Sequence, residues 1–110
     1  MSELGNLTLT GKSGKQYVFE VWPINTAFNA VAAVYAVTKA VQNAKGGRTH
    51  TVIYIGQTDN LKERFANHHK ADCFANHGAN CICTHRDDNE KSRLAKEADL
   101  IAAYNPPCND

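Results

Sequence analysis

The stretch Tyr54-Ile-Gly-Gln-Thr-Asp-Asn-Leu-Lys-Glu-Arg64 joins the end of one predicted element to the start of the next. Gly56 follows a run of β-branched and aromatic residues, which is typical of a strand that ends in a turn or that a ligand approaches closely. Asn60 is followed three residues later by Glu63, and this pattern favours a capped helix start. The sequence therefore predicts a strand over 49–55 and a helix over 61–70.

Around this stretch, the spacing of apolar and turn residues predicts a small antiparallel sheet. Strands are predicted over 7–10, 17–22, 32–38, 49–55 and 81–86. Glycine-containing turns over 11–15 and 43–48 make hairpins of the first two strands and of the next two. The expected fold is α+β, with a mainly antiparallel three-stranded sheet flanked by helices and an extra N-terminal β-hairpin.

The second half of the chain is predicted to hold a loop and a long helix. Residues 72–80 show no clear period and are expected to be a loop. Asp87-Asp-Asn-Glu90 is a second capping pattern, and it precedes a helix that carries Leu94, Ala98 and Ile101 on one face. Asn105-Pro-Pro ends this helix, because proline disfavours helical geometry in the residue before it.

The composition is that of one folded domain. The 110 residues are 43% apolar and 21% charged, with 12 Lys and Arg against 11 Asp and Glu. These values exclude a disordered chain, and we expect a single domain with an extension over 1–31 and a core over 32–110. The longest apolar run has eight residues, against roughly 20 needed to span a bilayer. With no secretory signal at the start, a cytoplasmic protein without a membrane partner is expected.

Several polar residues lie where a simple amphipathic pattern does not require them. Glu97 falls between the apolar positions of the last predicted helix, and a buried carboxylate is costly unless it is paired or bound to a metal. Arg64 and His68 share a helix face with apolar residues. Tyr35 and Tyr54 lie on the two central predicted strands. Each of these residues alone also fits a structural role, as a snorkelling, salt-bridged or packed side chain.

In combination, these residues resemble the GIY-YIG endonuclease family over about residues 32–110. Ala33-Val-Tyr35 and Tyr54-Ile-Gly56 occupy the positions of the two tyrosine motifs, and Arg64 follows ten residues after Tyr54. Glu97 lies on the later helix, and Asn109 follows it by twelve residues. Ala33 replaces the usual glycine, and the separation between the two tyrosines is longer than is usual in the family.

The resemblance implies hydrolysis of a phosphodiester with one divalent metal, Mg²⁺ or Mn²⁺. Glu97 would be the sole protein ligand of this metal, which suits an ion that prefers oxygen and keeps several waters. Tyr35 would be the general base, and Arg64 would hold the scissile phosphate. Tyr54 and His68 would position water or phosphate, and Asn109 would orient part of the site by hydrogen bonds.

The same resemblance implies a nucleic-acid substrate, and we expect DNA rather than RNA. Gly56, Lys62 and Lys70 are additional expected substrate contacts. Only about 30 residues lie outside the resemblance, so we expect low intrinsic sequence specificity and a protein partner that supplies targeting. The alternative is a binding module for nucleic acid or a protein partner that has the same fold and does not cut.

The cysteines and histidines of the second half raise a separate possibility. Five soft or borderline metal ligands lie within thirteen residues, namely Cys73, His77, Cys81, Cys83 and His85. Their spacing is not that of a usual zinc finger. We expect reduced, unligated thiols, including Cys108, rather than a structural Zn²⁺ site, because no secretory signal was found.

The net charge of +1 is the sum of two unlike parts. Residues 1–58 hold five basic and two acidic residues, and residues 59–110 hold seven basic and nine acidic residues. We expect a basic surface around Arg64 that is extended from the hairpins by Lys12, Lys15, Lys39, Lys45 and Arg48. This distribution predicts local capture of phosphate rather than tight nonspecific binding.

Overall fold

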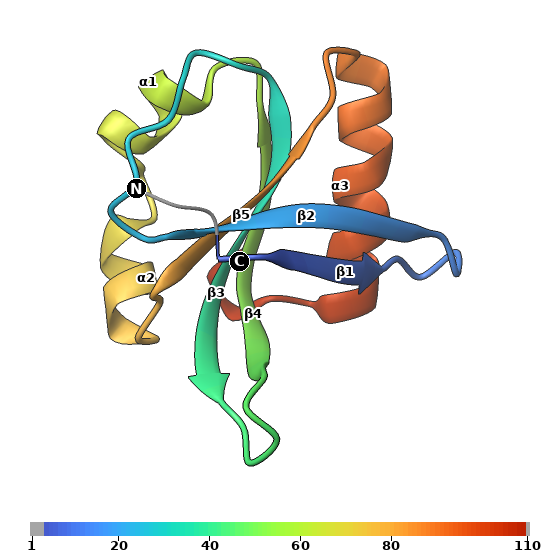
Figure 1. The fold of residues 1–110 in the computed structure, drawn as a ribbon. Helices are drawn as coiled ribbons and strands as arrows, with labels where there is room; N and C mark the ends of the chain where they lie inside the picture. Colours follow the sequence, from blue (N-terminus) through green and yellow to red (C-terminus); the bar gives the residue numbers. More distant parts are fainter. Residues whose placement is uncertain (1–3, 110) are drawn as a thin grey trace.

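Five antiparallel strands form one continuous sheet in the order β1-β2-β5-β3-β4 (Figure 1). The structure is a computed structural model that describes residues 4–109. The strands are β1 (Asn6–Thr10), β2 (Gln16–Pro23), β3 (Ala33–Gln42), β4 (Arg48–Thr58) and β5 (Cys81–Arg86). The predicted α+β fold is confirmed. The N-terminal hairpin is an added edge of the core sheet, because β2 pairs with β5.

Helices cover both faces of the sheet: in Figure 1 the short helices lie to its left and the long helix lies to its right. They are α1 (Leu61–Ala66), α2 (Ala71–Asn76), α3 (Glu90–Tyr104) and the short 3-10 helix η1 (Pro107–Asn109). Leu100 of α3 packs in one buried cluster with Phe19 and Val34, whereas Leu61 of α1 and Phe74 of α2 pack in another with Tyr35. No helix among residues 4–109 is both long and apolar enough to cross a membrane.

The segment after β4 differs from the sequence prediction. The helix expected over 61–70 ends at Ala66, and the loop expected over 72–80 contains α2. This short helix carries a single buried side chain, Phe74, so its sequence has no apolar period that could reveal it. Packing fixes it instead, because the Phe74 ring lies against Tyr54 and His68 with ring centroids 5.4 and 4.8 Å away.

The buried face of α3 also differs from the predicted apolar stripe. Leu94 is 46% exposed and Ala98 is exposed, whereas Arg93 and Leu100 are buried. The helix is therefore rotated relative to the prediction, while Glu97 is half-buried on the face turned toward the sheet. The buried Arg93 holds this face against the sheet through hydrogen bonds to Gln57 and Asp87. A pattern of apolar residues alone could not predict these polar contacts.

The N-terminal hairpin is fastened to α3 through Asp99. The carboxylate of Asp99 accepts hydrogen bonds from the backbone N–H and hydroxyl of Ser13, at 2.9 and 2.7 Å, and from the Tyr17 hydroxyl at 2.8 Å. Gly11 leaves the space for this contact, since a Cβ there would overlap the Asp99 carboxylate. The turn that carries Lys12 and Lys15 therefore lies against α3. The expected extension of the basic surface around Arg64 by these two lysines stays a prediction.

A disulfide joins Cys73 of α2 to Cys108 of η1, with an S–S distance of 2.07 Å. The prediction of reduced thiols is therefore wrong for these two residues, because folding brings together segments that are 35 positions apart. Cys81 and Cys83 are free and buried on β5. The bridge links α2, beside the aromatic cluster, to the C-terminal segment.

Reduction of this disulfide is expected to lower the free energy of unfolding by about 3 to 4 kcal/mol, because the cross-link removes the loop entropy of roughly 35 residues from the unfolded chain. Urea unfolding with and without a reductant measures the difference. The Cys73→Ser/Cys108→Ser variant serves as the control and should be insensitive to the reductant. A wild-type stability that is unchanged on reduction would contradict this expectation.

Candidate active site

Two tyrosines from neighbouring strands stack at the centre of the candidate site. Tyr35 of β3 is 1% exposed, and its ring lies 6.0 Å from that of Tyr54 on β4, with an angle of 30° between the planes. Between Val37 and Thr38 the register with β4 shifts, so that Tyr54 pairs with Val37 while Ile53 is left out of the ladder. This bulge places Tyr54 and Ile53 in the same buried environment as Tyr35.

Gly56 is the residue that makes room for the tyrosine pair. It lies directly opposite Tyr35 in the β3–β4 ladder. A Cβ at this position would lie 2.5 Å from the Tyr35 hydroxyl oxygen and 2.8 Å from Cε2 of Tyr54, closer than real side chains approach. The close approach expected at Gly56 is thus made by the chain's own aromatic rings, and its contact with substrate stays a prediction.

His68 is hydrogen-bonded to Tyr35 and is held in one tautomer. The backbone N–H of Lys70 donates to Nδ1 of His68 at 3.1 Å, so this nitrogen is an acceptor and the proton of the neutral ring is on Nε2. Nε2 lies 2.7 Å from the Tyr35 hydroxyl oxygen and therefore donates to it. Burial, followed by the charges of the surrounding basic residues, lowers the pKa of His68 to about 4, so the ring is neutral at pH 7.

Burial keeps both tyrosines protonated, and Arg64 opposes this effect. Desolvation raises the pKa of Tyr35 far above its usual value of 10.0 and raises that of Tyr54 as well. The nearby charge of Arg64, which is half-buried on α1, lowers the pKa of both phenols. A second positive charge close to this pair is therefore required if either phenol is to act as a base near neutral pH.

Glu97 extends from α3 to the end of β4 beside the same pair. Its half-buried carboxylate accepts a hydrogen bond from the backbone N–H of Gln57, and burial raises its pKa while that hydrogen bond and Arg64 lower it. In residues 4–109 the one ion pair within 4.0 Å joins Lys96 and Asp87. Glu97 is thus a partly desolvated carboxylate with no ion-pair partner at that distance among the described residues.

Arg93, which the sequence interpretation missed, anchors α3 to the end of β4. It is 3% exposed, one turn before Glu97 on α3. Its Nε donates to the side-chain oxygen of Gln57 at 3.0 Å, and its Nη1 donates to the Asp87 carbonyl at 3.0 Å. Gln57 therefore contacts two residues of α3: its side chain binds Arg93, and its backbone N–H lies beside the Glu97 carboxylate. Arginine and glutamate four residues apart on one helix face were the available sequence signal.

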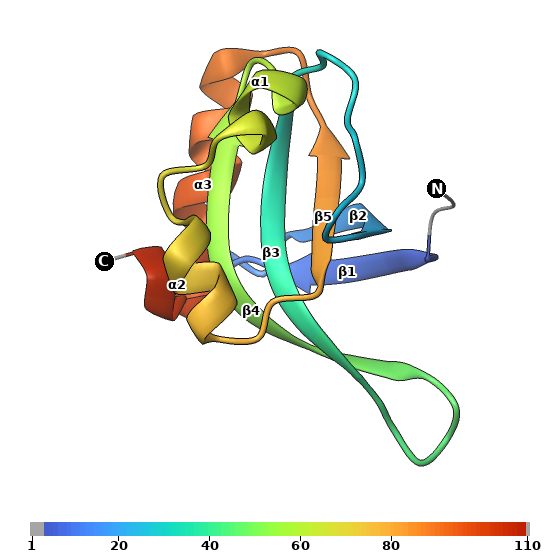
Figure 2. The same cartoon turned by 90° about the vertical axis from the view of Figure 1, so that its left-hand side faces the viewer.

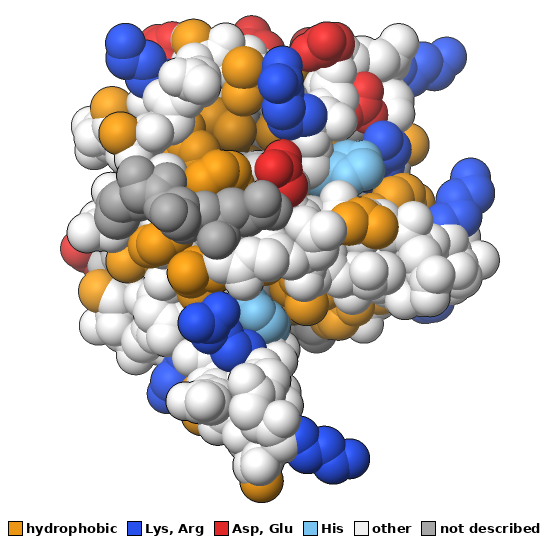
Figure 3. All heavy atoms as spheres, in the orientation of Figure 1, with side chains coloured by type: hydrophobic (Ala, Val, Ile, Leu, Met, Phe, Trp, Pro, Cys, Tyr) orange, Lys and Arg blue, Asp and Glu red, His pale blue; other side chains and the backbone are white. Residues whose placement is uncertain are grey.

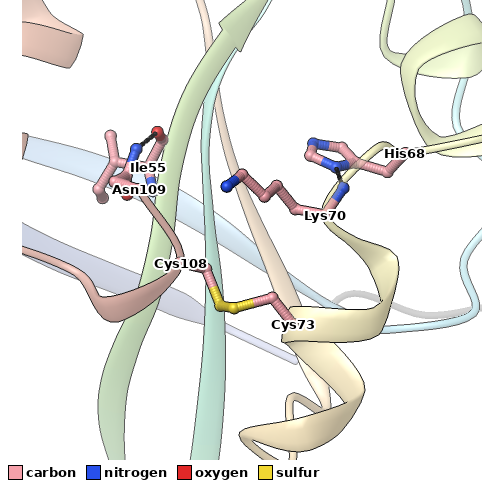
Figure 4. The surroundings of a disulfide bond; sticks show 6 residues. All are labelled: Ile55, His68, Lys70, Cys73, Cys108 and Asn109. Atoms are coloured by element: carbon pink, nitrogen blue, oxygen red, sulfur yellow. Dashed lines mark hydrogen bonds between the residues drawn. A yellow bond between two sulfur atoms is a disulfide. The ribbon is translucent and has the colours of Figure 1, made fainter.

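Asn109 reaches the site through the backbone of β4. Its side-chain oxygen accepts from the N–H of Ile55 at 2.9 Å, and its side-chain nitrogen donates to the Ile55 carbonyl at 2.8 Å. Ile55 lies between Tyr54 and Gly56, so the amide of Asn109 pairs with the strand at the level of the tyrosines (Figure 4). The predicted orienting role of Asn109 in catalysis stays a prediction.

The expected basic contacts occupy different positions. Lys70 is half-buried and, in Figure 4, its side chain extends from the segment after His68 toward β4. Lys62 is exposed on α1, outside the tyrosine cluster. A polar cavity of about 260 Å³ is lined by Arg64 together with Asp59 and Glu63, whose negative charges disfavour an anion there. This cavity is therefore an unfavourable place for a phosphate.

The five cysteines and histidines considered as possible metal ligands do not form one cluster. Cys81 and Cys83 are buried on β5, and burial raises the pKa of Cys83 to about 12. His85 contacts the Val18 carbonyl and the Lys96 ammonium, at 2.9 Å each. Cys73 and His77 instead lie close to Cys108. Sequence proximity along 73–85 was misleading, because β5 carries the later residues away from α2.

The low pKa of His68 predicts a loss of stability in acid. The unfolded ring takes up a proton near pH 6.5, whereas the folded ring does so only near pH 4, so stability present above pH 6.5 decreases as the pH falls toward 4. The contribution of His68 is on the order of 2 to 3 kcal/mol. Urea unfolding of wild type and His68→Gln at pH 7.5 and 4.5 measures it, and the variant should show the smaller decrease. Parallel decreases would contradict this assignment.

Comparison with known protein families identifies the domain that carries these residues. A family model described as GIY-YIG catalytic domain matches residues 32–109, which contain every one of the predicted catalytic residues. Searches of the curated proteins and of the solved structures gave no match. The N-terminal hairpin lies outside the matched range.

Proposed function

The chain belongs to the GIY-YIG nuclease family, and from this premise we propose that it is an endonuclease that hydrolyses phosphodiester bonds in DNA with Mg²⁺ or Mn²⁺. The observation that carries the proposal is the convergence of Tyr35 with His68 and Tyr54, beside Arg64 and the half-buried Glu97. These residues come from β3, β4, α1, α3 and the segment after α1. A packed core alone does not require an arginine, a carboxylate and a buried tyrosine–histidine pair at one place.

The donor chemistry at Glu97 fits a hard divalent cation. Glu97 offers carboxylate oxygen, lies beside the Gln57 N–H, and has no ion-pair partner within 4.0 Å among residues 4–109. Mg²⁺ binds through one or two carboxylates and keeps most of its waters, which substrate phosphate can replace. When bound, the ion would supply Lewis-acid stabilisation of the phosphate and a positive charge beside the tyrosines.

The protein residues would then share the remaining tasks. Arg64 would bind the scissile phosphate, where its planar guanidinium can donate to two oxygens at once. Tyr35 would first lose its own proton to solvent water and would then, as phenolate, accept the proton of the attacking water, which requires the positive charges around it to offset burial. His68 would stabilise the Tyr35 phenolate, because its Nε2–H already donates to that oxygen. Tyr54 would position water or phosphate.

Cleavage assays on defined substrates test the proposal. Linear, supercoiled, branched and single-stranded DNA, together with RNA, would be incubated with Mg²⁺ or Mn²⁺ at several pH values. We expect cutting of DNA with little sequence preference. If the folded protein leaves every substrate intact, the enzymatic proposal is wrong. If it also binds DNA in gel-shift assays without cutting it, a binding module on the same fold is the supported function.

The β3–β4 hairpin supports a nucleic-acid partner. It extends beyond the rest of the sheet (Figure 2) and carries Lys39, Lys45 and Arg48, which are all exposed. The sequence contains no Asp or Glu between Glu20 and Asp59. In Figure 3 blue basic side chains surround this lower part of the molecule. Lys39 lies on the same face of β3 as Tyr35, about 13 Å along the strand, so a backbone held there could continue into the site.

Removal of these three charges is expected to weaken substrate binding without slowing chemistry. In Lys39→Ala/Lys45→Ala/Arg48→Ala, KM should rise about tenfold or more at moderate salt, with kcat nearly unchanged, because the residues lie away from the tyrosines. The slope of log K against log salt should decrease by about 2 to 3, close to one per lost phosphate contact. Fluorescence anisotropy with labelled DNA at several salt concentrations measures this slope.

A matched variant changes three charges elsewhere. Lys12 and Lys15 lie on the turn against α3, and Lys91 is exposed near the start of that helix. Lys12→Ala/Lys15→Ala/Lys91→Ala makes the same change in net charge and should alter KM much less. Equal effects of the two triple variants would mean that only the total charge of the domain matters.

A further inference from the structure

Cys73, His77 and Cys108 form a compact set of soft ligands apart from the catalytic cluster. The two sulfur atoms and a ring nitrogen of His77 all lie within 4.8 Å of one another. Cys73 and His77 are four residues apart, so their side chains project from the same side of α2 and its end. Cys108 reaches them from η1. Of the described residues, these three are the only group of at least three His, Cys, Asp or Glu close enough to hold one ion.

The ligand types at this cluster select a different metal from the one expected at Glu97. Thiolate and imidazole groups favour Zn²⁺, whereas Mg²⁺ requires oxygen. Tetrahedral zinc with bonds of about 2.3 Å to sulfur and 2.0 Å to nitrogen places its ligand atoms roughly 3.5 to 3.8 Å apart. The separations in the cluster need only small adjustments to reach these values once the sulfurs are no longer bonded to each other. His77 is exposed, which leaves a path for an ion and for a water as the fourth ligand.

We propose that Cys73, His77 and Cys108 bind one Zn²⁺ when the disulfide is reduced, and that the disulfide and the zinc complex are alternative states of the same site. A dithiol reductant supplies two electrons and two protons, which convert the disulfide to two thiols while the dithiol becomes a disulfide. Each thiol then releases its proton as its sulfur binds the metal, and His77 binds through a neutral ring nitrogen. No electron is transferred to or from the zinc.

Either state ties the C-terminal segment to α2. Cys108 immediately precedes Asn109, which pairs with Ile55 beside Tyr54. Cys73 immediately precedes Phe74, whose ring packs against Tyr54 and His68. A zinc complex would therefore hold the same two segments that the disulfide holds, in an environment that reduces the thiols. The proposal concerns metal binding alone and does not depend on nuclease activity.

Metal titration of the reduced and oxidised protein tests the proposal. Protein reduced with a phosphine and desalted without oxygen would compete for Zn²⁺ with a chromophoric chelator. We expect one tightly bound Zn²⁺ per reduced chain and none per oxidised chain. Co²⁺ in place of Zn²⁺ should give a thiolate-to-metal charge-transfer band and the visible spectrum of a tetrahedral site.

Variants distinguish this cluster from other metal ligands. Cys73→Ser and Cys108→Ser should lose more affinity than the roughly 10- to 100-fold that follows loss of a partner outside the ligand sphere, and His77→Gln should also bind more weakly. Cys81→Ala removes a buried thiol elsewhere, and Glu97→Gln removes the expected magnesium ligand, so both should bind zinc as wild type does. Circular dichroism confirms that each variant is folded. Reduced wild type that binds no zinc, or binds it as Cys73→Ser does, would overturn the proposal.

Discussion

Replacing Glu97 by alanine is expected to reduce the cleavage rate by a factor of about 1000 or more while the protein remains folded. A bound metal ion contributes several kcal/mol of charge stabilisation in the transition state, and each 1.4 kcal/mol is a tenfold change in rate. Glu97 is the carboxylate that lies beside Tyr35, Tyr54 and Arg64, and each of these four groups affects the pKa of at least one other. Single-turnover cleavage over a range of Mg²⁺ concentrations measures the loss.

Two further measurements make the Glu97 result specific. Glu90→Gln changes an exposed carboxylate at the start of the same helix and should cut at the wild-type rate. Direct Mn²⁺ binding, followed by electron paramagnetic resonance, should weaken in Glu97→Ala and not in Glu90→Gln. Cleavage by Glu97→Ala at near the wild-type rate would indicate a contaminating nuclease or a different metal ligand.

Replacing Gly56 by alanine is expected to inactivate the protein and to destabilise it by about 1 to 3 kcal/mol. The added methyl group would lie 2.5 Å from the Tyr35 hydroxyl oxygen and 2.6 Å from Cζ of that ring. Overpacking of this kind forces side chains out of their preferred positions. Because Tyr35 also accepts from His68, a displaced ring would break the 2.7 Å hydrogen bond. Urea unfolding and the near-ultraviolet circular dichroism of the tyrosines measure both effects.

Gly47 offers a matched control on the same hairpin. A Cβ there meets Asn43 at 3.4 Å or more, which is ordinary contact, so Gly47→Ala should change stability and activity little. If Gly56→Ala kept the wild-type dichroism and cleavage rate, the tyrosine pair would not be the element that Gly56 protects. Loss of activity in both variants would point instead to the hairpin as a whole.

The sequence allowed a good prediction of elements that carry local signals. The Asn60 cap, with its side chain accepting from the Glu63 N–H at 3.1 Å, begins α1 where the capping pattern indicated. Asn89 likewise caps α3, and Asn105 ends it in a left-handed conformation just before the prolines. These signals depend on residues within a few positions of one another, which is the range over which a single sequence is informative.

The errors arose where distant parts of the chain determine the structure. Phe74 makes α2 a stable element only because Tyr54 and His68 lie beneath it, and Cys73 meets its partner 35 residues away. Arg93 was missed because a buried arginine is recognisable only from its partners, here Gln57 and Asp87. The motif positions of Tyr35, Tyr54 and Glu97 were recognised by resemblance. Their mutual distances, burial and pKa shifts could come only from the folded chain.

The pairing of Asn109 with Ile55 also has a consequence for solubility. β4 is an outer strand of the sheet, and an uncovered outer strand presents N–H and C=O groups that can recruit a strand from another molecule. The side-chain amide of Asn109 is hydrogen-bonded to both the N–H and the C=O of Ile55. At this point the C-terminal segment therefore prevents a strand of another molecule from pairing with β4. Molecules that lose this segment to a protease should therefore self-associate more readily than intact ones.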